Sequence, residues 1–369
     1  MKYLNNLSVA LFILFTSLTV AQTEKPQTPK GPFNYKIEDV TFINTEADSI
    51  VLAGTLTLPQ DTINPPVAIL INGSGAHDRD CDIMGHKSFW VIADYLTNNG
   101  IAVLRYDERG TAQSEGDFST ATTFNLAKDV EEAGINFLKS RTDIDASKIG
   151  LIGHSEGGLI APIVASTNTN VAFIVMLAGT GVNGQEVLQS QSKKIAELQG
   201  TTKEGIAFNH QLTTVAYDAL YTETETDKQK AAITLALENY KKQLEADQSP
   251  FAVYVNNIVI KQLASQLTNP WLYAFITLDP KAYLEKVTCP VLVLNGTKDV
   301  QVLPEINLPA IKKHLKTAKN KDVTIQEIEG LNHLFQTAKT GNINEYAKIE
   351  ETFSPVALKL ISDWINARF

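Results

Sequence analysis

The sequence predicts an α/β fold built on a mostly parallel, doubly wound sheet. Apolar runs such as residues 66–71 and 171–177 have the length and composition of strands that are buried on both faces. These runs alternate with segments of helical periodicity, and such alternation indicates parallel pairing through right-handed crossovers. One apolar run, from residue 149, also leads directly through a glycine-flanked turn into a helix. Together these observations favour a sheet with helices on both faces.

The same patterns place eight strands and the main helices along the chain. Strands are expected near residues 35–43, 50–58, 66–71, 101–105, 149–153, 171–177, 290–294 and 323–328. Helices are expected over 87–98, 123–139, 304–317 and 354–367, with one more beginning at the turn near residue 155. The polar turn 44–48 joins the first two strands. No internal repeat is evident.

The strand–helix alternation stops after Gly184 and resumes near residue 286. Between these points the chain is helical in pattern and rich in Gln, Glu, Lys and Ala, followed by several aromatic residues between 251 and 275. We therefore predict a helical cap, residues 185–285, inserted into one sheet domain formed by residues 34–184 and 286–369. The aromatic residues are interpreted as core of the cap in preference to an acyl pocket.

The first 21 residues resemble a secretory signal peptide. Lys2 precedes an apolar segment that runs to Val20, and Ala21 suits cleavage before Gln22. No cysteine follows the apolar run, which argues against a lipoprotein anchor, and an uncleaved membrane anchor is the alternative. We expect a secreted or periplasmic protein, with residues 22–33 as a flexible lead-in. Retention of residues 1–21 on the mature protein would contradict this expectation.

Composition narrows the classes of function. The formal net charge is −9 and no basic stripe is present, so nothing supports binding to nucleic acid. The two cysteines, Cys81 and Cys289, are expected to be free thiols, and two cysteines alone cannot form a structural zinc site. We find no motif for a metal or another cofactor.

The turn after the run at 149–153 carries a candidate nucleophile, Ser155, within the pattern Gly153-x-Ser155-x-Gly157. A serine hydroxyl needs a rigid, exposed position, a neighbouring base and donors for the oxyanion. A sharp strand-to-helix turn supplies the position, and glycines two residues before and after it leave room for the crowded backbone.

The candidate acid and base lie in loops that follow later strands. In an open α/β sheet, functional residues gather at the carboxyl ends of the strands. Asp299 follows the strand at 290–294 and His333 follows the strand at 323–328. Asp299 could instead only form a turn, and Asp279 is a weaker candidate for the acid.

The strand–turn–helix setting of Ser155 and the order Ser155, Asp299, His333 resemble the α/β-hydrolase superfamily, over residues 35–369. The resemblance implies a Ser-His-Asp triad and an acyl-enzyme. It also implies two backbone N–H donors for the oxyanion. One is that of Glu156, and the other is that of Ser74 or, as a fallback, Gly75. This chain departs from its relatives in having Asn72 where they commonly have histidine.

A second segment narrows the resemblance. Residues 107–114 resemble the Asp-x-Arg-Gly-x-Gly-x-Ser loop of the serine aminopeptidase (S33) branch, with Ala112 in place of the second glycine. We interpret Arg109 as the centre of an ion-pair network that braces the turn at Ser155, in preference to a substrate contact. Residues 77–80 are interpreted as salt-bridged scaffolding, and the Glu156 side chain is as readily solvated as directed into the site.

The function that these features favour is an exported serine hydrolase that cleaves carboxylic esters, with the cap selecting a small or medium acyl or alcohol group. An aminopeptidase or other peptide hydrolase is the alternative, and it would need a buried carboxylate to hold the substrate ammonium, for which Glu186, Glu197 and Glu204 are candidates. A non-enzymatic binding protein with the same fold is a third possibility. The expected partner is a small ester or peptide, and the oligomeric state is left open.

Overall fold

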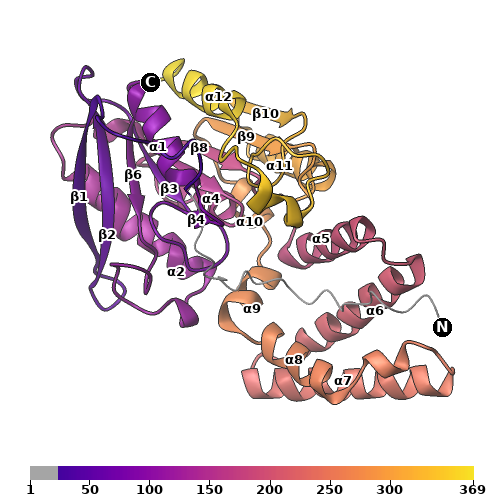
Figure 1. Ribbon diagram of the computed structural model, residues 1–369. Helices are drawn as coiled ribbons and strands as arrows, with labels where there is room; N and C mark the ends of the chain where they lie inside the picture. Colours follow the sequence, from indigo (N-terminus) through magenta and orange to yellow (C-terminus); the bar gives the residue numbers. More distant parts are fainter. Residues whose placement is uncertain (1–23) are drawn as a thin grey trace. The chain divides into compact units, whose positions relative to one another are not determined.

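The structure, a computed structural model, describes residues 24–369. This part of the chain forms two compact units (Figure 1). The sheet unit contains residues 24–182 and 279–369, and the helical unit contains residues 183–278. The segment predicted as a signal peptide, residues 1–21, lies outside the described residues, so export stays a prediction.

The sheet unit is built on an eight-stranded sheet, as the sequence predicts. The strand order is β1-β2-β6-β3-β7-β8-β9-β10, and only the pairings that involve β2 are antiparallel. The strands are β1 (Tyr35–Asn44), β2 (Ile50–Pro59), β3 (Val67–Ile71), β6 (Ala102–Tyr106), β7 (Ile149–His154), β8 (Val171–Leu177), β9 (Val291–Gly296) and β10 (Val323–Ile328). The order places β3 between β6 and β7, so the loops after these three strands leave the sheet side by side.

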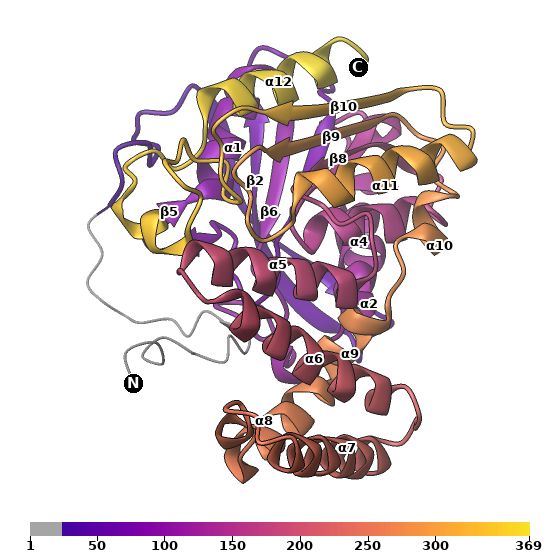
Figure 2. The same ribbon diagram turned by 90° about the vertical axis from the view of Figure 1, so that its right-hand side faces the viewer.

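Helices cover both faces of this sheet (Figure 2). On one face α1 (Ser88–Asn98) packs beside α12 (Pro355–Asn366). On the other, α4 (Gly157–Ala165) packs against β7 and β8, and α11 (Pro304–Thr317) against β9 and β10. The predicted helix 123–139 is α2 (Thr123–Lys128), a π-helical stretch η2 (Asp129–Ile135) and α3 (Asn136–Lys139). A short hairpin, β4 (Asp82–Ile83) and β5 (His86–Lys87), precedes α1.

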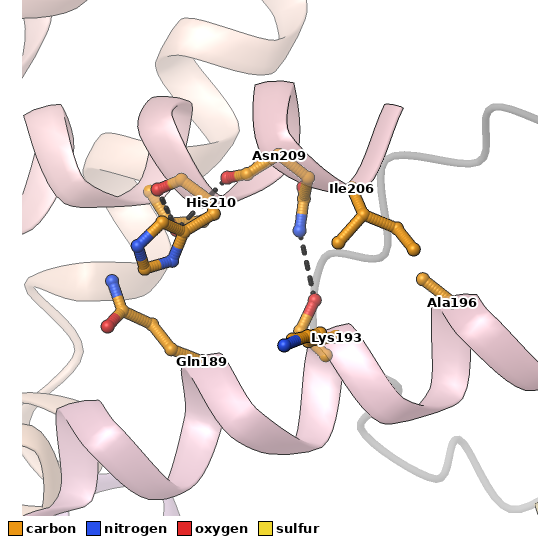
Figure 3. A pocket seen from close by; sticks show the side chains of 8 residues that line it. Gln189, Lys193, Ala196, Ile206, Asn209 and His210 are labelled. Carbon is orange, nitrogen blue, oxygen red and sulfur yellow. Dashed lines mark hydrogen bonds between the residues drawn. The ribbon is translucent and has the colours of Figure 1, made fainter. Parts of the chain in front are cut away.

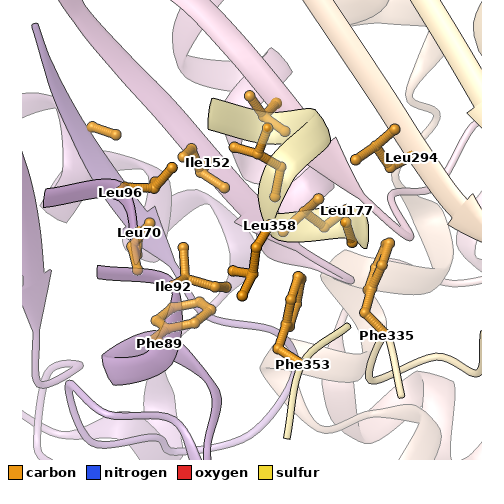
Figure 4. Packing of buried hydrophobic residues seen from close by; sticks show 14 of the residues in the cluster. Leu70, Phe89, Ile92, Leu96, Ile152, Leu177, Leu294, Phe335, Phe353 and Leu358 are labelled. Carbon is orange, nitrogen blue, oxygen red and sulfur yellow. The ribbon is translucent and has the colours of Figure 1, made fainter. Parts of the chain in front are cut away.

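A hydrophobic core between the sheet and the helices α1 and α12 also anchors the chain just after β10 (Figure 4). Phe335 is fully buried in this core and stacks on Phe353, with ring centroids 5.2 Å apart. The Phe335 carbonyl accepts the N–H of Ser354 at 2.8 Å. The loop that carries His333 is therefore fixed by packing two residues further along the chain.

The chain ahead of β1 is held against the C-terminal part of the sheet unit. The Lys25 ammonium donates to the carbonyls of Ala347 and Ile349 at 2.8 and 2.9 Å, and the Gln27 amide donates to the Phe353 carbonyl at 2.9 Å. These bonds hold Lys25 and Gln27, within the segment 22–33 that the sequence predicts as a flexible lead-in. Side-chain hydrogen bonds to backbone more than 300 residues away leave no periodic signal in the sequence.

The helical unit has its own core. Its helices are α5 (Gly184–Leu198), α6 (Lys203–Leu220), α7 (Thr226–Ala246), α8 (Asn257–Leu267) and α9 (Pro270–Thr277). Leu212, Ile233 and Leu263 are buried between them, and Phe208 stacks on Phe251 at 4.8 Å. Phe251, Tyr254, Trp271 and Tyr273 pack against this core, as predicted for these aromatic residues.

The helical unit ends at Leu278, whereas the predicted cap extends to residue 285. The intervening helix α10 (Lys281–Leu284) packs against α4 and α11 and so belongs to the sheet unit. Both cysteines are free. None of the helices within residues 24–369 has the length and apolar character that crossing a membrane requires.

Candidate active site

Ser155 lies at a strained turn between β7 and α4. Its φ of 56° is in the left-handed region, which residues other than glycine rarely adopt. Its N–H donates to the Leu177 carbonyl of β8 at 2.8 Å, and its carbonyl accepts the N–H of Gly158 at 2.9 Å. These bonds hold the side chain at the carboxyl end of the central strand, the geometry expected of an activated nucleophile.

The glycines on each side of Ser155 are required by close backbone contacts. A Cβ atom at Gly153 would lie 1.9 Å from the Gly157 carbonyl oxygen, and one at Gly157 would lie 2.2 Å from the Ile71 carbonyl oxygen. Backbone atoms on both sides leave no room to relax, so the sequence pattern here reflects crowding between β3, β7 and α4.

We expect the substitution Gly153→Ala to destabilise the sheet unit by about 3 kcal/mol or more, because the added methyl meets backbone and not a movable side chain. Urea unfolding of the purified protein measures this loss. Gly330→Ala is the matched control, since a Cβ at Gly330 meets nothing within 4 Å and only its positive φ of 80° is unfavourable. Its expected cost is about 1 kcal/mol. Equal losses in the two variants would contradict the crowding argument.

Asp299 and His333 are brought together as the sequence predicts. The His333 Nδ1–H donates to Asp299 Oδ2 at 2.8 Å, and both side chains are buried. The other carboxylate oxygen, Oδ1, accepts the N–H groups of Gln301 and Val302 at 2.8 and 2.9 Å. Three donors therefore fix the carboxylate, and the carboxylate fixes the ring of His333 with Nε2 free to act as a base.

His154 links the turn at Ser155 to the His333 loop, a contact that the sequence does not reveal. Its Nε2–H donates to the His333 carbonyl at 2.8 Å, and the two rings have centroids 4.8 Å apart. Burial lowers the pKa of His154 to about 3, and the neighbouring His333 adds to this effect. The turn at Ser155 directs the ring of His154 toward the loop that carries the base.

His154 thus connects the turn that carries Ser155 to the loop that carries His333. No hydrogen bond joins the Ser155 hydroxyl to His333 Nε2 within residues 24–369. Without a substrate, catalytic hydrogen bonds are often long and shorten in the reacting complex. The Ser155 side chain is half-buried.

The loop after β3 lies against the nucleophile. A Cβ at Gly73 would be 3.1 Å from Ser155 Cβ, which places this backbone in contact with the turn. The N–H groups of the next two residues, Ser74 and Gly75, make no hydrogen bond within the described part of the chain. They are available to an oxyanion. The Asn72 amide is fully buried, and neither of its polar atoms has a partner among the described residues.

Ion pairs hold this loop, as predicted for residues 77–80. The Arg79 guanidinium binds Asp107 through Nε at 3.1 Å and Nη2 at 2.6 Å, and Asp80 pairs with Arg105. Asp107 also accepts the Arg79 N–H at 2.8 Å. The bidentate pair ties the end of the loop to the segment after β6.

The role of Arg109 is also structural. Its guanidinium pairs with Asp129 at 2.7 and 2.6 Å and donates to the Asn125 carbonyl of α2 at 3.2 Å. At the start of α2, Thr123 donates its hydroxyl to Glu156 Oε1 at 2.6 Å. Arg109 therefore braces the turn at Ser155 indirectly, through α2. The Glu156 side chain is buried, which excludes the solvated alternative.

A small cavity of about 20 Å³, room for one water molecule, lies between α5 and α6 of the helical unit (Figure 3). It is lined by residues such as Gln189, Ile206 and His210 and contains none of the predicted catalytic residues. The described residues also contain no group of three or more His, Cys, Asp or Glu side chains arranged to hold a metal ion.

Comparison with known proteins was made at the level of sequence and of structure. Residues 86–337, more than half of the chain, match the family described as "Serine aminopeptidase, S33". The chain is also 26% identical over 322 residues to Esterase EstD of Thermotoga maritima. That alignment covers 87% of this chain but only 65% of the relative, so the chain spans less than two thirds of the relative's length.

The solved structures that resemble this one share its fold at low sequence identity. The Pyrococcus furiosus esterase Pf2001 superposes with a TM-score of 0.55 at 12% identity, covering 94% of this chain and 98% of that chain. The hypothetical protein PA2218 from Pseudomonas aeruginosa gives a TM-score of 0.52 at 15% identity, covering 95% and 98%. These likenesses confirm the predicted α/β-hydrolase fold.

Proposed function

Since the chain belongs to the serine aminopeptidase (S33) family of α/β-hydrolases, we propose that it hydrolyses carboxylic esters, with Ser155 as nucleophile, His333 as base and Asp299 as acid. The single observation that carries this proposal is the buried hydrogen bond between His333 and Asp299, 2.8 Å long, on a loop that contacts the turn of Ser155 through His154. The esterase relative from Thermotoga maritima supports the choice of ester.

In the proposed reaction, His333 Nε2 removes the proton of the Ser155 hydroxyl as the oxygen attacks the ester carbonyl. The tetrahedral oxyanion is stabilised by the N–H of Glu156, at the N-terminus of α4, and by that of Ser74 or Gly75. The imidazolium of His333, paired with Asp299, then protonates the leaving alcohol, which leaves an acyl-enzyme. Water, activated by His333, releases the acid and restores Ser155.

A peptide hydrolase is the second candidate, favoured by the description of the matched family. An aminopeptidase must hold the substrate ammonium with a buried carboxylate. The predicted candidates Glu186, Glu197 and Glu204 do not meet this requirement, because none of them is buried in the helical unit. These three residues therefore give no support to an aminopeptidase.

A substrate panel tests the choice between these two. We expect p-nitrophenyl acetate and butyrate to be hydrolysed with a kcat/KM at least tenfold above that of aminoacyl-p-nitroanilides, a difference of about 1.4 kcal/mol in transition-state free energy. Comparable efficiency on the anilides would support the peptidase. Failure of the folded protein to hydrolyse any member, or to react with a fluorophosphonate probe, would favour a binding protein and reject both enzymatic functions.

A further inference from the structure

The segment after β6 holds the loop after β3 by a reciprocal pair of contacts with one residue, His77. The Glu108 carboxylate oxygen Oε2 accepts the His77 N–H at 2.9 Å, and the Glu108 N–H donates to the His77 carbonyl at 3.2 Å. Glu108 itself is buried. Because β6 and β3 are adjacent in the sheet, this contact joins the carboxyl ends of two neighbouring strands.

His77 in turn reaches back to the residues that face Ser155. Its Nε2–H donates to the Ser74 carbonyl at 3.0 Å. Gly75, with φ of 110°, lies next to the ring. The carbonyl of Ser74 and the N–H of Gly75 belong to one planar trans peptide and point in opposite directions. The imidazole therefore sets the orientation of this peptide and, through it, the direction of the Gly75 N–H, one of the two candidate oxyanion donors.

Glu108 also lies close to the other half of the predicted oxyanion site. Burial raises the pKa of its carboxyl well above the usual range, and the charges of Glu156 and Asp129 act in the same direction against the opposing hydrogen bond from His77. Glu156 follows the nucleophile directly. The raised pKa favours the uncharged carboxyl, which adds no further negative charge to the surroundings of an oxyanion.

We propose that His77 and Glu108 are positioning residues for catalysis: Glu108 fixes His77, and His77 fixes the peptide of Ser74 and Gly75 so that an N–H faces the oxyanion. This proposal rests on the function proposed above. It assigns no contact with substrate to either residue. Their effect is expected in the chemical step, because an oxyanion donor acts on the transition state more than on the bound ester.

The test measures kcat and KM for p-nitrophenyl butyrate with the full-length protein. We expect His77→Ala and Glu108→Leu each to lower kcat by about 100-fold with KM changed less than about twofold, the size of effect seen when an oxyanion donor is misplaced. Glu108→Gln keeps an oxygen acceptor for the His77 N–H and should retain activity within about threefold. The double variant should be no worse than either single one, because both act through one contact.

A matched control is His86→Ala, which removes another histidine from the segment that follows. The His86 ring is buried and bonds the Thr352 hydroxyl at 3.1 Å and the Tyr346 carbonyl at 3.0 Å. This variant should lower the melting temperature and leave kcat of the folded protein unchanged. If Glu108→Leu does not fold, the proposal is tested at His77 alone, which is half-buried, with the variants His77→Ala and His77→Phe.

The possible results distinguish failure of the positioning role from failure of the proposed function. An inactive wild-type protein, or activity that survives Ser155→Ala, would reject the proposed function. An active, Ser155-dependent wild type whose His77→Ala variant keeps its kcat within threefold would overturn only the positioning role. A rise in KM at constant kcat would do the same, since it would show a contact with the bound substrate.

Discussion

The variant Ser155→Ala is expected to lose essentially all hydrolysis of p-nitrophenyl butyrate, with kcat lower by about a millionfold, as when the nucleophile of a serine protease is removed. Alanine keeps the Cβ atom and therefore the same backbone strain at φ of 56°, so stability should change little. Stopped-flow burst kinetics and fluorophosphonate labelling measure the loss directly.

Ser166→Ala is the control for this variant. Ser166 caps the same helix, α4, at its C-terminus, and its hydroxyl donates to the Ile163 carbonyl at 2.7 Å. Its removal should leave kcat unchanged. Labelling of Ser155→Ala by the probe at the wild-type rate would mean that a different residue is the nucleophile, and the triad proposed here would then be wrong.

The fold could be predicted because its central strands are buried on both faces. Residues 67–71 and 149–154 are entirely buried, so their apolar runs contrast sharply with the helices between them. The contacts of Lys25 and Gln27 with the C-terminal region are polar and non-periodic, and for that reason the sequence indicated a flexible segment. The boundary near residue 278 was also missed, because α10 is short and has no pattern that assigns it to either unit.

The candidate catalytic residues could be predicted where their positions follow from the ends of strands. Asp299 and His333 each follow a strand, and β9 and β10 are neighbours, so their side chains meet at one edge of the sheet. Glu108 and His77 could not be found in this way, since their contact depends on β6 lying beside β3 and on the path of a loop. The contact between His154 and His333 could not be predicted either, because the direction of His154 depends on the left-handed conformation of Ser155.

Replacing the acid by its amide, Asp299→Asn, should lower kcat by about 10⁴-fold at pH 7 while the site stays in place. Asparagine can keep the acceptor for the N–H groups of Gln301 and Val302, so the loop should hold its shape. Its NH2 group then faces His333 Nδ1 and forces that nitrogen to accept. The ring proton moves to Nε2, the atom that must take the proton from Ser155, and the base is lost. Steady-state kinetics and the unfolding midpoint separate this effect from misfolding.

Asp279→Asn is the discriminating control, because Asp279 is the competing candidate for the acid in the sequence. Among the described residues its carboxylate accepts only the N–H of Lys281, at 2.9 Å, and it serves as a turn residue before α10. We expect this variant to keep full activity. If Asp279→Asn were inactive and Asp299→Asn active, the hydrogen bond between His333 and Asp299 would have to be structural only. The tautomer argument, and with it the assignment of His333 as the base, would then lose its support.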